Sequence, residues 1–374
     1  MKILLTGGGS GGHFYPSIAV AEAINQLVDE KKIVGVKLYY MSDKRYDERA
    51  LFENDITFKS ATYGKVRNYF SILNFFDWIK IILGIITATW KMFWLFPDVV
   101  FGKGGGASFP PLFAARLLRI PVVIHESDAV PGKVNLWAAK FARRIAISYP
   151  EAEKYFPKDK TALTGIPIRV AVSRAVSNGA REFLKLDEDA PVILILGGSQ
   201  GAQKINDAIV DILPTLVEKY YVLHQTGVKN LEATSRRAEV VLEKSSHANR
   251  YRPFAFLNAS ALSMAAGAAT LVITRAGSTA LTEIANWGLP AIVIPIPESV
   301  SRDQTQNALS YVRTGAGILI EEHNLTPHIL SAEIEKIVGD EALRIKMKNA
   351  TANFSRPDAA RKIADELIHI ALHQ

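Results

Sequence analysis

The feature that most constrains the fold is a unit that occurs twice: a short β-branched strand, a glycine-rich turn and a helix. The first copy consists of KILLT (2–6), GGGSGGH (7–13) and a helix over 16–30, and the second is PVILILGGSQGAQKINDAIVDIL (191–213). Strands that alternate with helices form parallel sheets covered on both faces. We therefore predict an α/β protein with two Rossmann-like, doubly wound domains. The other expected strands are 36–41, 98–102, 121–126, 144–148, 161–165, 220–226, 270–277 and 290–297.

The length of 374 residues fits two such domains. The join is expected near 165–169, which gives an N-terminal domain over 1–165 and a C-terminal domain over 166–354. Residues 355–374 are expected to form an amphipathic helix with Pro357 in its first turn. The chain has no cysteine, which excludes disulfides, thiolate metal sites and cysteine nucleophiles. The first hydrophobic run ends by Gly7, so no signal peptide is expected.

Glycine-rich turns follow strands in both halves. The turn at 7–13 formally satisfies the dinucleotide pattern G-x-G-x-x-G through Gly7, Gly9 and Gly12, and Asp43 ends the second strand, where an NAD enzyme holds its ribose. The same turn leaves backbone N–H groups at a helix N-terminus for phosphate or sugar oxygens. His13 stands at its rim, either as a functional group or as a cap of the helix. The other turns are 102–108, 197–202 and 274–288, and the four together predict one ligand cleft between the halves.

The net charge of +7 lies in the first half: residues 1–165 contain 22 basic and 15 acidic residues, and residues 166–374 contain 22 of each. In this half, residues 69–96 are rich in Phe, Trp and Ile. Their longest uncharged run, 81–90, is shorter than the roughly 20 residues needed to span a bilayer. We predict one or two helices with an apolar, basic-rimmed surface for a membrane, an internal helix pair being the alternative. The expected stripe is Phe75, Phe76, Ile79, Ile82, Ile86, Trp90 and Phe93, and the expected basic rim is Lys80, Lys91, Arg116, Arg119, Lys140, Arg143 and Arg144.

Seven segments of the chain occur in the order seen in the MurG family. This family comprises the bacterial N-acetylglucosaminyltransferases of glycosyltransferase family 28, and the resemblance spans essentially the whole chain. It implies the GT-B architecture, with two Rossmann-like domains facing across a cleft and the C-terminal helix 355–374 returning to the first domain. The matching segments are GGGSGGH (7–13), GKGGGAS (102–108), IHESDAVPGKVN (124–135), TGIPIR (164–169), GGSQGAQ (197–203), TRAGSTALTEIANWGLPAIVIPIP (274–297) and DQTQNA (303–308).

The resemblance also implies a reaction, an inverting transfer of GlcNAc from UDP-GlcNAc to the C4 hydroxyl of MurNAc in lipid I. The product is lipid II, used in peptidoglycan synthesis, cell wall biogenesis and cell division. His13 matches the favoured general base, Glu283 a residue on the ribose, and Gln304 a glutamine that reads the sugar hydroxyls. The other implied substrate-binding residues are Ser10, Gly11 and Gly12 at the sugar and acceptor, Asp128 at the position of an amide of the family, Arg169 and Ser199 on the donor diphosphate, Leu257 by its backbone on uracil, and Ser278, Thr279, Ala280, Leu281 and Thr282 on diphosphate and ribose.

Three positions depart from the pattern of the family. Asp128 replaces an amide, and an anion can accept from sugar hydroxyls but cannot donate. Gly106 stands where relatives often have tyrosine. Lys103 adds a positive charge beside the expected acceptor diphosphate. The transferase interpretation survives these changes, whereas the details of acceptor binding do not follow from the pattern.

The implied partners are UDP-GlcNAc, undecaprenyl-linked lipid I, an anionic membrane surface and other proteins of cell-wall synthesis and division. The expected location is the cytoplasmic face of the plasma membrane, as a peripheral protein. No cofactor, no metal and no nucleic acid is expected, because neither metal-ligand spacing nor a nucleic-acid motif is present. Two other functions stay open: another GT-B enzyme on a UDP-sugar, such as a glycolipid synthase or a UDP-GlcNAc 2-epimerase, and an NAD-dependent oxidoreductase or non-catalytic nucleotide-binding module.

Overall fold

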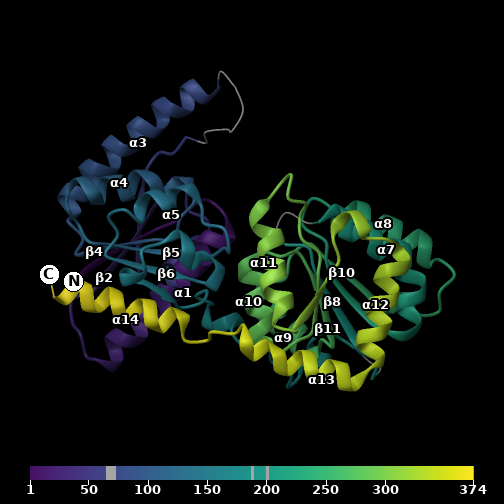
Figure 1. Ribbon diagram of the computed structural model, residues 1–374. Coiled ribbons are helices and arrows are strands. Elements are labelled where there is room, and N and C mark those ends of the chain that lie inside the picture. Colours follow the sequence, from purple (N-terminus) through teal and green to yellow (C-terminus); the bar gives the residue numbers. More distant parts are fainter. Residues whose placement is uncertain (65–72, 187–188, 199–201, 374) are drawn as a thin grey trace. The chain divides into compact units, whose positions relative to one another are not determined.

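The computed structural model describes residues 1–64, 73–186, 189–198 and 202–373. The chain divides into two compact units, of which unit 1 comprises Met1–Arg169 and Pro357–Gln374, and unit 2 comprises Val170–Arg356. Each unit contains one parallel sheet with helices on both faces (Figure 1). The predicted fold class, two doubly wound α/β domains, is therefore confirmed.

Unit 1 is built on a sheet with the strand order β3-β2-β1-β4-β5-β6-β7, in which every pair is parallel. This is the Rossmann order extended by one strand, and its switch point lies between β1 and β4. Thr6 at the end of β1 pairs with Gly102 at the end of β4, so the glycine turns that follow these strands lie side by side. The strands are β1 (Lys2–Thr6), β2 (Lys37–Ser42), β3 (Ile56–Ser60), β4 (Val99–Gly102), β5 (Val122–Glu126), β6 (Arg144–Ile147) and β7 (Thr161–Leu163).

The two faces of this sheet bury different helices because successive strand residues point to opposite sides. Ile3 and Leu5 pack with α1 (Gly11–Glu30), α2 (Glu48–Glu53) and α14 (Ala359–Leu372). Leu4 packs on the other face, with α3 (Leu73–Leu95), α4 (Phe109–Leu117) and α5 (Lys133–Ala138). The amphipathic helix α14 thus belongs to unit 1 and lies along α1.

Unit 2 repeats the Rossmann order as β10-β9-β8-β11-β12-β13, again with parallel pairs throughout. Helices α7, α8 and α12 cover one face and α9, α10 and α11 the other. The strands are β8 (Val192–Leu196), β9 (Tyr221–Gln225), β10 (Tyr251–Phe254), β11 (Leu271–Thr274), β12 (Ala291–Val293) and β13 (Gly317–Leu319). The helices are α6 (Ala180–Phe183), α7 (Gln203–Lys219), α8 (Leu231–Leu242), α9 (Ala259–Ala268), α10 (Ser278–Trp287), α11 (Arg302–Arg313), α12 (Pro327–Gly339) and α13 (Glu341–Ala350).

Several element boundaries differ from those expected. Helix α1 begins at Gly11 rather than at residue 16, so His13 lies in its first turn and not before the helix. Pro357 precedes α14 instead of occupying its first turn. Strands β3, β10 and β13 were not predicted. All three are edge strands, and none has an aliphatic run as long as that of the central strand β8.

Helix α3 is a single helix with an exposed apolar face. Ala88 and Met92 pack against the sheet, whereas Ile82, Trp90 and Phe93 are each more than half exposed. An internal helix pair is therefore the wrong interpretation of this segment. The side chains of Phe75 and Phe76 lie outside the described residues.

The length and composition of α3 also meet the requirement for crossing a membrane, contrary to the expectation from its uncharged run. The stretch Asp77–Leu95 has a mean hydropathy of 1.4 and is 22% buried. Of the expected basic rim, Lys80, Arg116, Arg119, Lys140 and Arg143 are exposed, whereas Lys91 is half-buried and donates to the carbonyl of Ser60 at 2.6 Å. Arg144 instead pairs at 3.0 Å with Glu366 of α14, on the opposite face of the sheet from α3.

Candidate active site

His13 lies where the glycine turn after β1 meets the glycine turn after β4. Its ring nitrogen Nδ1 is 2.8 Å from the hydroxyl of Ser10, the N-cap residue of α1. Gly8 and Gly105 let the ring approach closely, since a Cβ on Gly105 would lie 3.2 Å from Nε2. When Nδ1–H donates to Ser10, Nε2 carries a lone pair and can accept a proton.

Burial and a neighbouring cation keep His13 neutral. Burial, together with the positive charge of Lys103, lowers its pKa from 6.5 to about 4, while the charge of Asp128 opposes the shift. At neutral pH the imidazole is therefore uncharged, and one of its two ring nitrogens can accept a proton.

Lys103 is an almost fully buried cation in the turn after β4. Its ammonium contacts the hydroxyl of Ser127, and burial lowers its pKa to about 8 while Glu126 and Asp128 favour the charged form. A buried lysine is costly unless acidic groups compensate it. Lys103 is thus a buried cation of unit 1 that the carboxylates of Glu126 and Asp128 compensate.

Glu126, at the end of β5, holds the turn that carries Asp128. Its carboxylate accepts from the backbone N–H of Asp128 at 3.1 Å and of Gly132 at 3.0 Å, and from the Asn135 side-chain amide at 2.9 Å. Burial raises its pKa, as does the charge of Asp128. The motif IHESD is therefore a scaffold that fixes the position of Asp128 relative to Lys103.

Arg169 lies at the end of unit 1 and stacks on α1. Its guanidinium is 3.8 Å from the ring centroid of Tyr15, whose hydroxyl donates to Asp47 at 3.3 Å. A guanidinium stacked on an aromatic face keeps its in-plane N–H groups available for an anion. Sequence reasoning missed Tyr15, although its place two residues after His13 on α1 was visible.

In unit 2, the candidate site residues lie at the start of α10, which follows β11. Ser278 is buried, and its hydroxyl accepts from the Asn307 side chain at 2.9 Å. Leu281 and Thr282 are also buried, and the backbone N–H of Leu281 donates to the carbonyl of Gly277 at 3.0 Å. Thr279, Ala280 and Glu283 are partly exposed on the first turns of the helix.

Two other residues that are expected to bind UDP-GlcNAc, Gln304 and Leu257, already make contacts within the protein. The Oε1 of Gln304 accepts from the backbone N–H of Ile296 at 3.3 Å, which aligns the side chain but leaves the NH₂ group as its donor end. The backbone N–H of Leu257 donates to Oε1 of Gln225 at 3.0 Å. A base at Leu257 would therefore pair with its carbonyl oxygen or displace Gln225.

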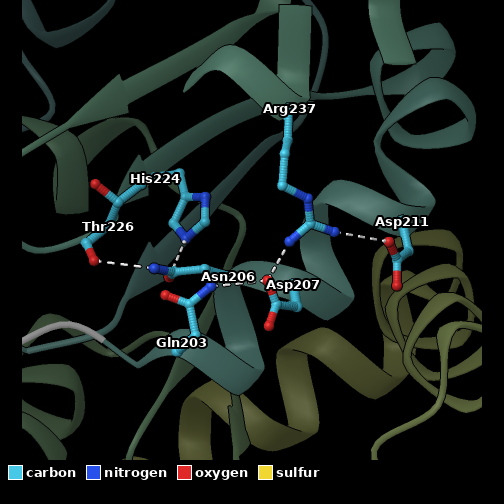
Figure 2. A network of polar contacts seen from close by, with 7 residues as sticks. All are labelled: Gln203, Asn206, Asp207, Asp211, His224, Thr226 and Arg237. Carbon is cyan, nitrogen blue, oxygen red and sulfur yellow. Dashed lines mark hydrogen bonds and ion pairs between the residues drawn. The ribbon is translucent and has the colours of Figure 1, made fainter. Parts of the chain in front are cut away.

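A polar network fixes helix α7, the helix that follows β8 (Figure 2). His224 of β9 is fully buried, with Nε2 3.0 Å from Oδ1 of Asn206. Its Nδ1 lies 3.1 Å from the hydroxyl of Tyr251. Asn206 also donates to the carbonyl of Thr226 at 3.0 Å. On the same helix, Asp207 pairs with Arg237. Ser199, between β8 and α7, lies outside the described residues.

Among the described residues, no group of three or more His, Asp or Glu side chains is placed to hold a metal ion. Within unit 1, the structure brings together Ser10, Gly11, Gly12, His13 and Asp128, with Arg169 stacked on the same helix α1 as His13.

Comparison with known proteins gives matches over the whole chain. Residues 3–147 match the glycosyltransferase family 28 N-terminal domain, and residues 192–363 match the family's C-terminal domain. The UDP-N-acetylglucosamine–N-acetylmuramyl-(pentapeptide) pyrophosphoryl-undecaprenol N-acetylglucosamine transferase of Treponema pallidum is 34% identical over 371 residues, which is 98% of this chain and 94% of the relative. The crystal structure of Acinetobacter baumannii MurG has a TM-score of 0.74 at 25% identity, covering 98% of this chain and 99% of that one.

The chain belongs to the MurG family of glycosyltransferase family 28. Solved structures outside the MurG family share the fold: a UDP-GlcNAc 2-epimerase from Neisseria meningitidis bound to UDP-GlcNAc has a TM-score of 0.67 at 16% identity, covering 99% of this chain and all of that one. At that identity the likeness concerns the fold alone. Membership in the MurG family therefore decides between the transferase and the epimerase interpretations, which the fold by itself does not separate.

Proposed function

We propose that this chain transfers GlcNAc from UDP-GlcNAc to the C4 hydroxyl of MurNAc in lipid I, producing lipid II for peptidoglycan synthesis. The observation that carries the proposal is the 34% identity to a named N-acetylglucosamine transferase over 98% of the chain. The matched segments include the turn with His13 and the helix start with Glu283, which are the two places where the chemistry requires particular side chains.

His13 acts as the general base on the acceptor hydroxyl. Its Nε2 takes the proton as the hydroxyl oxygen forms a bond to the anomeric carbon, and the bond from that carbon to the UDP oxygen breaks. Because attack and departure occur on opposite faces, the configuration inverts and no protein nucleophile is needed. When Nδ1–H donates to the hydroxyl of Ser10, Nε2 is the nitrogen that accepts this proton.

The donor, UDP-GlcNAc, is bound by residues that match the motifs of the family. Glu283 accepts the ribose hydroxyls, and the amide NH₂ of Gln304 donates to the GlcNAc hydroxyls. The N-terminus of α10, the guanidinium of Arg169 and Ser199 bind the diphosphate, with no metal or cofactor required.

The enzyme works at the cytoplasmic face of the membrane, since lipid I does not leave the bilayer. The exposed apolar face of α3 supports peripheral docking on an anionic surface. Lys80 of α3 and Arg116 of the adjoining helix α4 supply positive charges for this docking. Other partners are proteins of cell-wall synthesis and division.

The test is transfer of radiolabelled GlcNAc from UDP-GlcNAc to a synthetic lipid I analogue, followed by extraction into butanol. We expect label in the butanol phase with the acceptor present, and the same rate in EDTA. A UDP-sugar epimerised without acceptor, and no label in butanol, would contradict the proposal. His13→Ala should lower turnover by about 10²- to 10⁴-fold, the range for a lost acid–base group.

A further inference from the structure

Tyr63 occupies the space above Gly106, in the glycine turn after β4. A Cβ added to Gly106 would overlap the hydroxyl oxygen of Tyr63 and contact its ring. The φ of Gly106 is not in the left-handed region, so its backbone would accept a side chain if Tyr63 were absent. Glycine at this position, where a tyrosine was expected from the resemblance, is thus explained by a tyrosine that reaches the same place from another segment.

Residues 60–64, here called the strap, hold Tyr63 in place along α3. The ammonium of Lys91 donates to the carbonyl of Ser60 at 2.6 Å. The carbonyl of Thr62 packs on Gly84, and Gly64 packs on the carbonyl of Asp77, so closely that a Cβ on either glycine would overlap these atoms.

The three contact positions on α3, Asp77, Gly84 and Lys91, are seven residues apart. Seven residues are about two helical turns, so these positions lie in one line along the helix. The strap follows this line in the opposite direction to the helix, with Tyr63 between the last two contacts. The phenol is therefore fixed to both α3 and the glycine turn.

Tyr63 and His13 cover neighbouring residues of that turn. The His13 ring packs on Gly105 and the Tyr63 hydroxyl lies over Gly106. Tyr63 is half-buried, and burial together with the charges of Asp43 and Asp77 raises its pKa, so that the hydroxyl keeps its proton as a donor.

We propose that Tyr63 is a specificity-determining residue for the acceptor, its hydroxyl donating a hydrogen bond to an oxygen of the lipid-linked acceptor beside the Gly105–Gly106 backbone. This inference rests on the proposed transferase function. The sequence motifs assign acceptor binding only to the glycine turns, whereas this inference adds a residue of the strap. It concerns the acceptor rather than UDP-GlcNAc.

The first test is Tyr63→Phe, which removes only the hydroxyl, with Tyr155→Phe as the control. Tyr155 is a partly exposed tyrosine of unit 1 outside the site. We expect the KM for a lipid I analogue to rise about tenfold in Tyr63→Phe, the effect of one lost hydrogen bond, while kcat and the KM for UDP-GlcNAc stay within about twofold. The control should leave all three constants unchanged.

The second test is a double-mutant cycle with Gly106→Ala. The added methyl should displace Tyr63 and raise the acceptor KM as Tyr63→Ala does, whereas adding Gly106→Ala to Tyr63→Ala should have little further effect because the clash is gone. Equal circular dichroism spectra and melting temperatures establish that each variant folds.

An unchanged acceptor KM in Tyr63→Phe would overturn the inference, as would effects of Gly106→Ala and Tyr63→Ala that simply add. If the wild-type chain forms no lipid II, the proposed function itself fails. If the wild type forms lipid II normally and the Tyr63 variants match it, only the role of Tyr63 fails.

Discussion

The low pKa of His13 predicts an unusual pH dependence for a histidine-dependent reaction. The base is active when neutral, so kcat/KM should fall as the pH drops through the pKa of the free enzyme. With a pKa of about 4, about 97% of His13 is neutral at pH 5.5, whereas about 9% would be neutral at the ordinary value of 6.5. We therefore expect kcat/KM at pH 5.5 to be close to its value at pH 8.

Lys103→Met tests the cause of this shift. The substitution removes a positive charge that lowers the pKa of His13 and leaves Asp128, which raises it. The midpoint of the acid limb should therefore move upward, and the loss of kcat/KM at pH 5.5 should become measurable. Lys37→Met, at an exposed position at the start of β2, is the control and should leave the limb in place.

The assay combines kcat/KM from pH 4.5 to 8.5 on a soluble lipid I analogue with NMR titration of the histidine rings, where His13→Gln assigns the His13 signal. A His13 midpoint near 6.5 with a roughly tenfold loss of kcat/KM at pH 5.5 would refute the argument from burial. A midpoint that Lys103→Met does not move would show that the cation is not a cause.

Three further predictions concern the donor, the membrane face and acid stability. Glu283→Ala should raise the KM for UDP-GlcNAc about tenfold or more, because ribose hydroxyls lose a charged acceptor, and Gln304→Ala should reduce the preference for UDP-GlcNAc over UDP-GalNAc; an unchanged donor KM would mean that the carboxylate points elsewhere. Replacing Ile82, Trp90 and Phe93 by Ser should reduce binding to anionic vesicles and activity on a long-chain acceptor while sparing a short-chain one, with exposed Val240→Ser as control; equal losses on both acceptors would contradict docking through α3. Burial lowers the pKa of His224 from 6.5 to about 3. Below pH 6.5 the unfolded state therefore binds a proton that the folded state does not, and the free energy of unfolding decreases as the pH is lowered. This residue should account for about 2 kcal/mol of lost unfolding free energy by pH 5, and urea unfolding of His224→Gln should show a correspondingly weaker pH dependence.

The central strands and their glycine turns could be predicted from the sequence because both signals are local. An aliphatic run such as ILL or VILIL and the glycines that follow it are visible without knowledge of any neighbour. The Rossmann order and the membership of α14 in unit 1 depend on packing between distant segments, and only the family resemblance implied the latter.

The polar details of the site were less predictable for the same reason. Burial of Lys103 and its effect on His13 require three strand ends to meet, and no local pattern specifies that. The stacking of Arg169 on Tyr15 and the overlap of Tyr63 with the space over Gly106 join residues more than forty positions apart. The sequence gives the positions of these residues in the chain, whereas their contacts and pKa values depend on the fold.

Helix α14 has a consequence for how the chain folds during synthesis. Ile363, Leu367 and Ile368 fill the core of unit 1 against α1, yet the ribosome adds them only after every residue of unit 2 has been made. Unit 2 is continuous in sequence and can close its core first, although it emerges second. Until then, unit 1 leaves exposed the part of α1 and of its sheet that α14 covers, and this apolar surface is what a chaperone would recognise in the nascent chain.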